Sequence, residues 1–217
     1  MGKAKAAREV SVIGGADGPT SIFIAGKTGK RPLKERVRRY FYQRRRQRVE
    51  RKIKPGAHTL QEVTAYVVEK YHAVEMSEQQ MSYIEQRKCL KESLIITNKP
   101  ELLGDMNEIP KPEEYTEDTI KEMQRQIQLR SEMIADMPDD VIPMDFHIYE
   151  VHVDEGWMEI AIDHLWDILE CSYSGNKKVM KLLKEMAKDI YLYYGVMQED
   201  VENKSKRYSS LVTMLCT

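Results

Sequence analysis

A sharp division of charge near Lys54-Pro55-Gly56 constrains this chain more than any other feature of its sequence. Residues 1–54 hold 17 basic and 4 acidic side chains, a net charge of +13, although the whole chain of 217 residues has a net charge of −1. Residues 55–217 therefore carry a net charge of −14. A basic head and an acidic body share one chain, so each must keep its charges solvated or paired.

The basic head contains an arginine-rich segment from Lys27 to Lys54, with 14 basic residues and two acidic ones. Apolar residues recur there at helical spacing and arginine fills the other faces, which predicts a basic helix over residues 31–54. Arginine binds phosphate bidentately, and aromatic rings offer stacking surfaces to bases. The residues expected to bind nucleic acid or an acidic partner are Arg38, Arg39, Arg44, Arg45, Arg46, Arg48, Arg51, Lys52, Tyr40, Phe41 and Tyr42.

The same arginine-rich helix has three other interpretations. It would also suit a solvated surface, docking on the acidic body of its own or a second chain, or anionic lipid. The near cancellation of the two charges favours self-association, yet exposed ion pairs contribute only about 0–1 kcal/mol each. The charge therefore identifies a binding footprint without choosing its partner.

The acidic body is predicted to be mainly α-helical. Thr59 and Glu62 form a capping-box signature that opens one helix, and Phe146 to Val153 is rich in β-branched and aromatic residues, which favours a strand. Other helices are expected at residues 77–96, 116–137, 157–169 and 177–194. We predict a bundle of about five helices with one or two short strands, preceded by a strand-loop-strand and the basic helix.

The expected domain organisation has three parts. These are an N-terminal segment and linker (1–30), the arginine-rich helix (31–54) and the acidic helical domain (57–217), with a linker near 104–115. The chain is 32% charged with a mean hydropathy of −0.58, which argues against a polytopic membrane protein. Three cysteines without metal-ligand spacing, and no secretory signal, favour the cytoplasm.

Gly14-Gly15-Ala16-Asp17-Gly18-Pro19-Thr20 is the most distinctive motif of the head. With its apolar flanks, about Val10 to Ala25, it resembles the ion-site segment of the β subunit of sodium-translocating decarboxylases. The resemblance implies that Asp17 coordinates Na⁺ in an unwound transmembrane helix, within a loop that includes Gly14, Gly15, Gly18 and Thr20. The alternative is a plain turn between two short strands, with Asp17 capping backbone N–H groups.

Ser21 to Thr28 has the spacing of a phosphate-binding loop, with Lys27 in the position of its lysine. Ser21 stands where the first glycine of that motif belongs, and the four residues after it are apolar. Such a run favours a strand over a loop that turns its N–H groups around phosphate. Nucleotide binding is the third hypothesis for the chain.

A metal site is one further interpretation of the acidic body. His147, His152 and His164 lie near several carboxylates, and Glu159, Asp163 and Asp167 would share one face of the expected helix. The spacing matches none of the established metal motifs, so a solvated acidic face is the simpler interpretation. Asp154 and Glu155 are also among the carboxylates near these histidines.

Taken together, these patterns favour a non-enzymatic interaction protein without a cofactor, whose arginine-rich helix binds nucleic acid or an acidic protein. No nucleophile elbow and no supported Cys/His pair occurs in the sequence. The second hypothesis is a membrane component like the decarboxylase β subunit, for which Na⁺ would be the bound ion. A membrane span is not expected, because the sequence after the motif turns basic.

Overall fold

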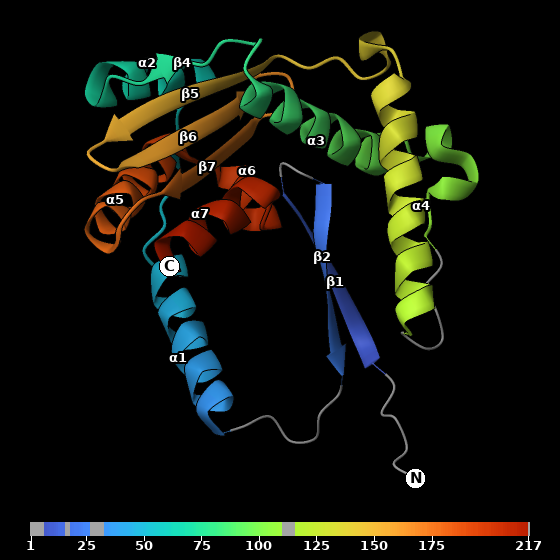
Figure 1. Ribbon diagram of the computed structural model, residues 1–217. Helices are drawn as coiled ribbons and strands as arrows, with labels where there is room; N and C mark the ends of the chain where they lie inside the picture. The colour runs from blue at the N-terminus through green and yellow to red at the C-terminus, as the bar shows by residue number, and fades with distance from the viewer. Residues whose placement is uncertain (1–6, 16–17, 27–32, 110–115, 217) are drawn as a thin grey trace. The chain divides into compact units, whose positions relative to one another are not determined.

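The structure is a computed structural model that describes residues 7–15, 18–26, 33–109 and 116–216. Side chains are described from residue 33 onward, except that of Glu35. The chain divides into two units (Figure 1). The sheet unit comprises Arg31–Met76 and Met144–Thr217, and the hairpin-helix unit comprises Met1–Lys30 and Ser77–Pro143.

A four-stranded antiparallel sheet in the order β4-β5-β6-β7 is the centre of the sheet unit. Strand β5 occupies Phe146–Val153, as the sequence predicts. Met158, Ile160 and Ile162 alternate along β6 and are fully buried on one face, against a core that also includes α2, α5 and α7. The remaining strands are β4 (Val74–Glu75), β6 (Gly156–Asp163) and β7 (Ile168–Ser174).

Five helices (Figure 1) and a short two-stranded ladder complete the described part of the sheet unit. The capping box predicted at Thr59 is present, with the Glu62 N–H donating to the Thr59 hydroxyl and the Thr59 N–H donating to the Glu62 carboxylate. Asn176 caps the predicted helix at 177–194. The elements are α1 (Leu33–Glu50), β3 (Gly56–Ala57), α2 (Leu60–Tyr71), α5 (Lys177–Tyr194), β8 (Gly195–Val196), α6 (Gln198–Asn203) and α7 (Lys206–Cys216).

The predicted bundle of about five helices with one or two short strands is wrong. The segment expected as a helix from Trp157 to Leu169 forms most of β6, a turn and the start of β7. Its apolar residues satisfy both a helical period and an alternating one, and burial in the sheet selects the second. Trp157 and Leu165, which the helical pattern places on the core face, are 38% and 61% exposed. The fold is therefore a mixture of α-helices and antiparallel sheet.

The hairpin-helix unit contains a β-hairpin and two long helices. Strands β1 (Ala7–Gly15) and β2 (Gly18–Gly26) pair antiparallel, with Val12 opposite Ile22, as expected for a strand-loop-strand. The buried Lys91 donates to the carbonyl of Met137 and the carboxylate of Asp139, which ties α3 to the end of α4. The elements are α3 (Met81–Asn98), η1 (Pro100–Met106), α4 (Glu117–Asp136) and η2 (Asp139–Val141).

Asp189 joins α5 to α2 in the sheet unit. Its Oδ2 accepts hydrogen bonds from the Tyr71 hydroxyl at 2.6 Å and the Lys70 ammonium at 2.7 Å, and a third from the Tyr66 hydroxyl. Burial raises the pKa of Asp189, but the hydrogen bonds from Lys70, Tyr66 and Tyr71 outweigh it and hold that pKa below its ordinary value. The ionised form of Asp189 is therefore the form that stabilises this junction.

Asp189→Asn is expected to lower the free energy of unfolding at pH 7 by about 1 kcal/mol, a modest value because the carboxylate is partly exposed. A lowered folded pKa means that the stabilisation is fully present above the unfolded pKa of about 4 and is lost as pH falls through the folded pKa. Urea unfolding at pH 7 and pH 3 measures both effects. Glu69→Gln is the control, because it neutralises an exposed carboxylate on α2. A deficit in Asp189→Asn that is equally large at pH 3 would contradict this account.

Candidate nucleic-acid interface

Helix α1 presents most of the predicted binding residues to solvent. Arg38, Arg39, Arg44, Arg45 and Arg48 are exposed along it, and Arg51 and Lys52 are exposed in the turn that follows. The rings of Tyr40, Phe41 and Tyr42 are 57%, 63% and 42% exposed. The helix thus forms where the sequence predicts it, without burying its aromatic residues.

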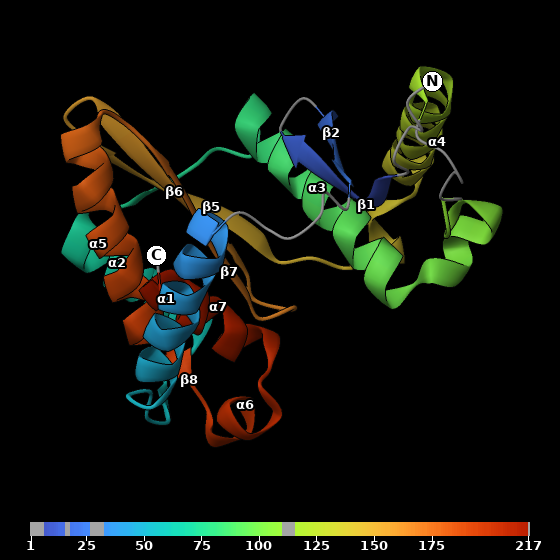
Figure 2. The same cartoon turned by 90° about the horizontal axis from the view of Figure 1, so that it is seen from below.

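The C-terminal end of α1 is docked on the sheet unit beside α7 (Figures 1 and 2). Val49 and Ile53 pack against the main core. Arg46 forms an ion pair with Glu50 at 2.9 Å within the helix. Cys216, at the end of α7, lies close enough to Arg46 and Glu50 to feel their charges, although burial is the main cause of its raised pKa. The last turns of α1 are therefore held in place.

The opposite side of α1 combines aromatic and basic side chains. At about 100° per residue, Tyr40 and Arg44 lie roughly 180° and 140° from Val49 around the helix, and Arg48 and Phe41 lie on the flank next to Arg44, roughly 100° and 80° from Val49. The rings of Tyr40 and Phe41 meet edge to face with their centroids 5.8 Å apart. We call Tyr40, Phe41, Arg44 and Arg48 the outer stripe. It offers π-faces and guanidinium groups on one surface.

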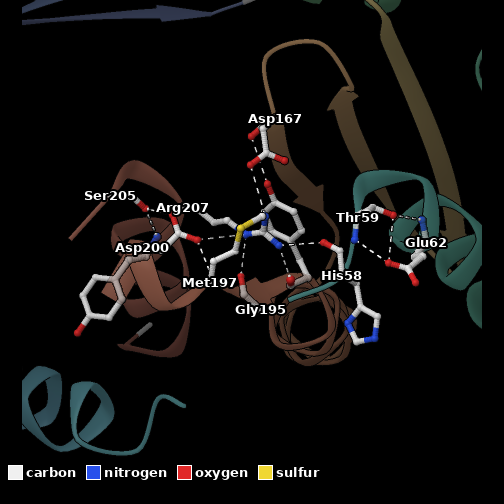
Figure 3. Close-up of polar contacts among 11 residues, drawn as sticks. His58, Thr59, Glu62, Asp167, Gly195, Met197, Asp200, Ser205 and Arg207 are labelled. Carbon is white, nitrogen blue, oxygen red and sulfur yellow. Dashed lines mark hydrogen bonds and ion pairs between the residues drawn. The ribbon is translucent and has the colours of Figure 1, made fainter. Parts of the chain in front are cut away.

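Arg207 anchors α7, the helix on which α1 rests. Its buried guanidinium donates to the carbonyls of Tyr194 at 2.6 Å, His58 at 2.9 Å and Gly195 at 3.0 Å. It also lies 3.5 Å from the centre of the Tyr194 ring. Figure 3 shows Arg207 between Asp167, Gly195 and His58. One side chain thereby connects α7 to β8 and to the segment that follows α1.

The glycine-rich motif of the head is part of the β1-β2 hairpin. Gly14 and Gly15 end β1, whereas Gly18 and Thr20 lie in β2. Asp17, the residue that the decarboxylase resemblance assigns to Na⁺, falls outside the described residues. Ser21 to Gly26, the first part of the predicted phosphate loop, lie in strand β2, and Lys27 falls outside the described residues.

The residues of the metal interpretation are only partly brought together. Glu159 and Asp163 lie in β6 and Asp167 precedes β7, so they share no helix face, and Asp163 is buried with its carboxylate accepting from the N–H groups of Leu165 and Trp166. His152 is exposed near the far end of β5, close to Asp154 and Glu155 in the β5-β6 turn.

His147 and His164 do approach each other, together with Asp145. Their candidate ligand atoms all lie within 4.8 Å of one another. Asp145 is absent from the residues expected from the sequence, although an Asp-x-His spacing at the start of a strand places both side chains on one face.

No known protein family, curated protein or solved structure shows a significant match to this chain. Among the helices in the described ranges, none has the length and apolar character needed to cross a lipid bilayer.

Proposed function

We propose that α1 binds single-stranded nucleic acid, namely RNA in the cytoplasm, through its outer stripe. The observation that carries this proposal is the exposure of Tyr40 and Phe41 beside Arg44 and Arg48 on a helix whose C-terminal end is docked. Large aromatic side chains are normally buried. Two of them exposed side by side mark a surface that a partner covers.

The chemistry of the outer stripe suits an unpaired strand. Arg44 and Arg48 would hold successive phosphates by bidentate hydrogen bonds, while Phe41 and Tyr40 would stack on bases. Stacking requires bases that are splayed away from a duplex, so single strands are favoured over double strands. Docking of the helix end on α7 reduces the ordering cost of binding.

An acidic protein surface is the competing partner, because guanidinium groups bind carboxylates as well as phosphates. The two exposed rings favour nucleic acid, since a carboxylate offers no π-face for them. Binding of nucleic acid should therefore depend on Phe41, whereas binding of an acidic protein should not.

The test measures anisotropy of a labelled 20-nucleotide single-stranded RNA over a range of salt concentrations. Arg44→Gln/Arg48→Gln is expected to weaken binding about tenfold or more at low salt and to reduce the slope of log K against log salt by about 1.4, because each phosphate contact contributes about 0.7. Phe41→Ala is expected to lose about 1–3 kcal/mol of affinity for the single strand and little for a duplex.

Lys177→Gln/Lys181→Gln is the matched control, because it removes the same charge from exposed positions on α5. Equal weakening by this control and by the α1 variant would show that only net charge matters, which overturns the proposed interface. Competition by polyglutamate as effective as that by RNA, with no effect of Phe41→Ala, would assign α1 to an acidic protein instead.

A further inference from the structure

Four ionisable side chains meet at one end of the sheet, at the margin of its core face. Glu75 is in β4, Asp145 immediately precedes β5, His147 is in β5 and His164 immediately follows β6. The pairing of the strands brings these side chains together. The His164 N–H donates to the Asp145 carbonyl at 3.1 Å, which extends the β5-β6 ladder by one pair beyond Phe146 and Asp163. Asp145 and His164 therefore face the same side of the sheet as His147.

The contacts around His147 differ at its two ring nitrogens. Nδ1 lies 2.6 Å from Oε1 of Glu75, and Nε2 lies 3.1 Å from Oδ1 of Asp145. The ring of His164 is tilted toward that of His147, with centroids 5.6 Å apart. Nδ1 of His164 is buried and has no hydrogen-bond partner among the described residues.

We infer that Asp145, His147 and His164 form a binding site for a divalent transition-metal ion, with Zn²⁺ as the expected occupant. Two imidazoles and one carboxylate form a ligand set typical of zinc sites that keep a position open for water. The ion would replace the proton between Nε2 of His147 and the carboxylate of Asp145. Both groups would then bind the ion, together with a ring nitrogen of His164. Side chains of Asp145 and Glu75 that are 52% and 54% exposed leave the site accessible from solvent.

Glu75 has a separate role in this arrangement, as a positioning residue. Its short contact with Nδ1 of His147 fixes the proton on that nitrogen and directs Nε2 toward the ion. Carboxylate-histidine-metal chains of this kind orient the imidazole and raise its basicity. A simple ion-pair cluster accounts for His147 between two carboxylates, but it gives no partner to the buried nitrogen of His164.

The site is tested by calorimetric titration of the whole chain with Zn²⁺ after removal of metals with a chelator. We expect one ion per chain in the wild type, loss of this stoichiometric binding in His164→Ala and in Asp145→Asn, and about 10- to 100-fold weaker binding in Glu75→Gln. His152→Ala is the matched control, because it removes an exposed histidine from the same strand and should leave binding unchanged.

Co²⁺ provides a second readout on the folded wild type that does not depend on any variant. Visible d–d bands of a low-symmetry site without thiolate charge transfer would place the ion on nitrogen and oxygen ligands. Thiolate charge-transfer bands would move it to Cys89, Cys171 or Cys216 and overturn the assignment. Absence of binding in the wild type, or binding unchanged in His164→Ala, would overturn it as well.

Discussion

Gly195→Ala is expected to lower the free energy of unfolding by at least about 3 kcal/mol. Gly195 has φ +63, a conformation that residues with a Cβ rarely adopt. A Cβ built at this position would lie 1.8 Å from the carbonyl oxygen of Gly56 and 2.9 Å from its carbon. Both are backbone atoms of the β3-β8 ladder, so the clash cannot be relieved by rotating a side chain. Urea unfolding followed by circular dichroism measures the loss.

Gly56→Ala is the matched control, because Gly56 lies across the same ladder and a Cβ added there meets nothing within 4 Å. The control should change stability by less than about 1 kcal/mol. Equal losses in the two variants would mean that the ladder tolerates a shift of its backbone, which contradicts the expected strain. A larger loss in Gly195→Ala locates the strain at the β8 side.

Local patterns predicted those elements whose signals do not depend on the rest of the chain. The capping box at Thr59 and Glu62 marks the start of α2, and the apolar stripe of α5 has a single clear period. Strand β5 was predictable because its residues are rich in β-branched and aromatic types. In each case the local preference and the tertiary environment agree.

The sheet beyond β5 could not be predicted, because its residues satisfy two periods. Ile160 fits both a helical stripe through Trp157 and an alternating row through Met158 and Ile162. The choice was made by the partner strands β5 and β7, which cover both edges of β6. Pairing between distant segments is a tertiary effect that a local pattern does not contain.

The two candidate sites also differ in how much of each a local sequence pattern contains. The candidate interface on α1 is continuous in sequence, so its exposed basic and aromatic residues could be grouped from the sequence alone, although the division of α1 into a docked end and an outer stripe required the contact with α7. The proposed metal site joins Asp145, His147 and His164, and the register of β5 and β6 brings them together, while β4 places Glu75 against His147. Glu75 in particular lies in a two-residue strand that carries no sequence signal.

Arg207→Met is expected to cost about 3–5 kcal/mol of unfolding free energy, which makes it the second large effect. The substitution keeps most of the side-chain volume but removes the donors to the carbonyls of His58, Tyr194 and Gly195. The carbonyls of His58 and Gly195 would then lose this donor at a buried or partly buried position, where each unsatisfied group costs about 1–3 kcal/mol, whereas the Tyr194 carbonyl would keep the His58 N–H as a donor. Arg207→Lys should recover part of the loss, because one ammonium group cannot reproduce the planar fork.

Lys206→Met controls for the loss of a positive charge on α7, since Lys206 is the exposed neighbour of Arg207. It should change stability by less than about 0.5 kcal/mol.

Hydrogen exchange then separates local from global effects of Arg207→Met. If Arg207 holds the platform for α1, amides in the docked turns near Val49 should exchange faster in Arg207→Met under conditions in which β5 and β6 remain protected. Uniformly faster exchange across the sheet unit would instead make Arg207 a general core residue, with no particular role in positioning the outer stripe.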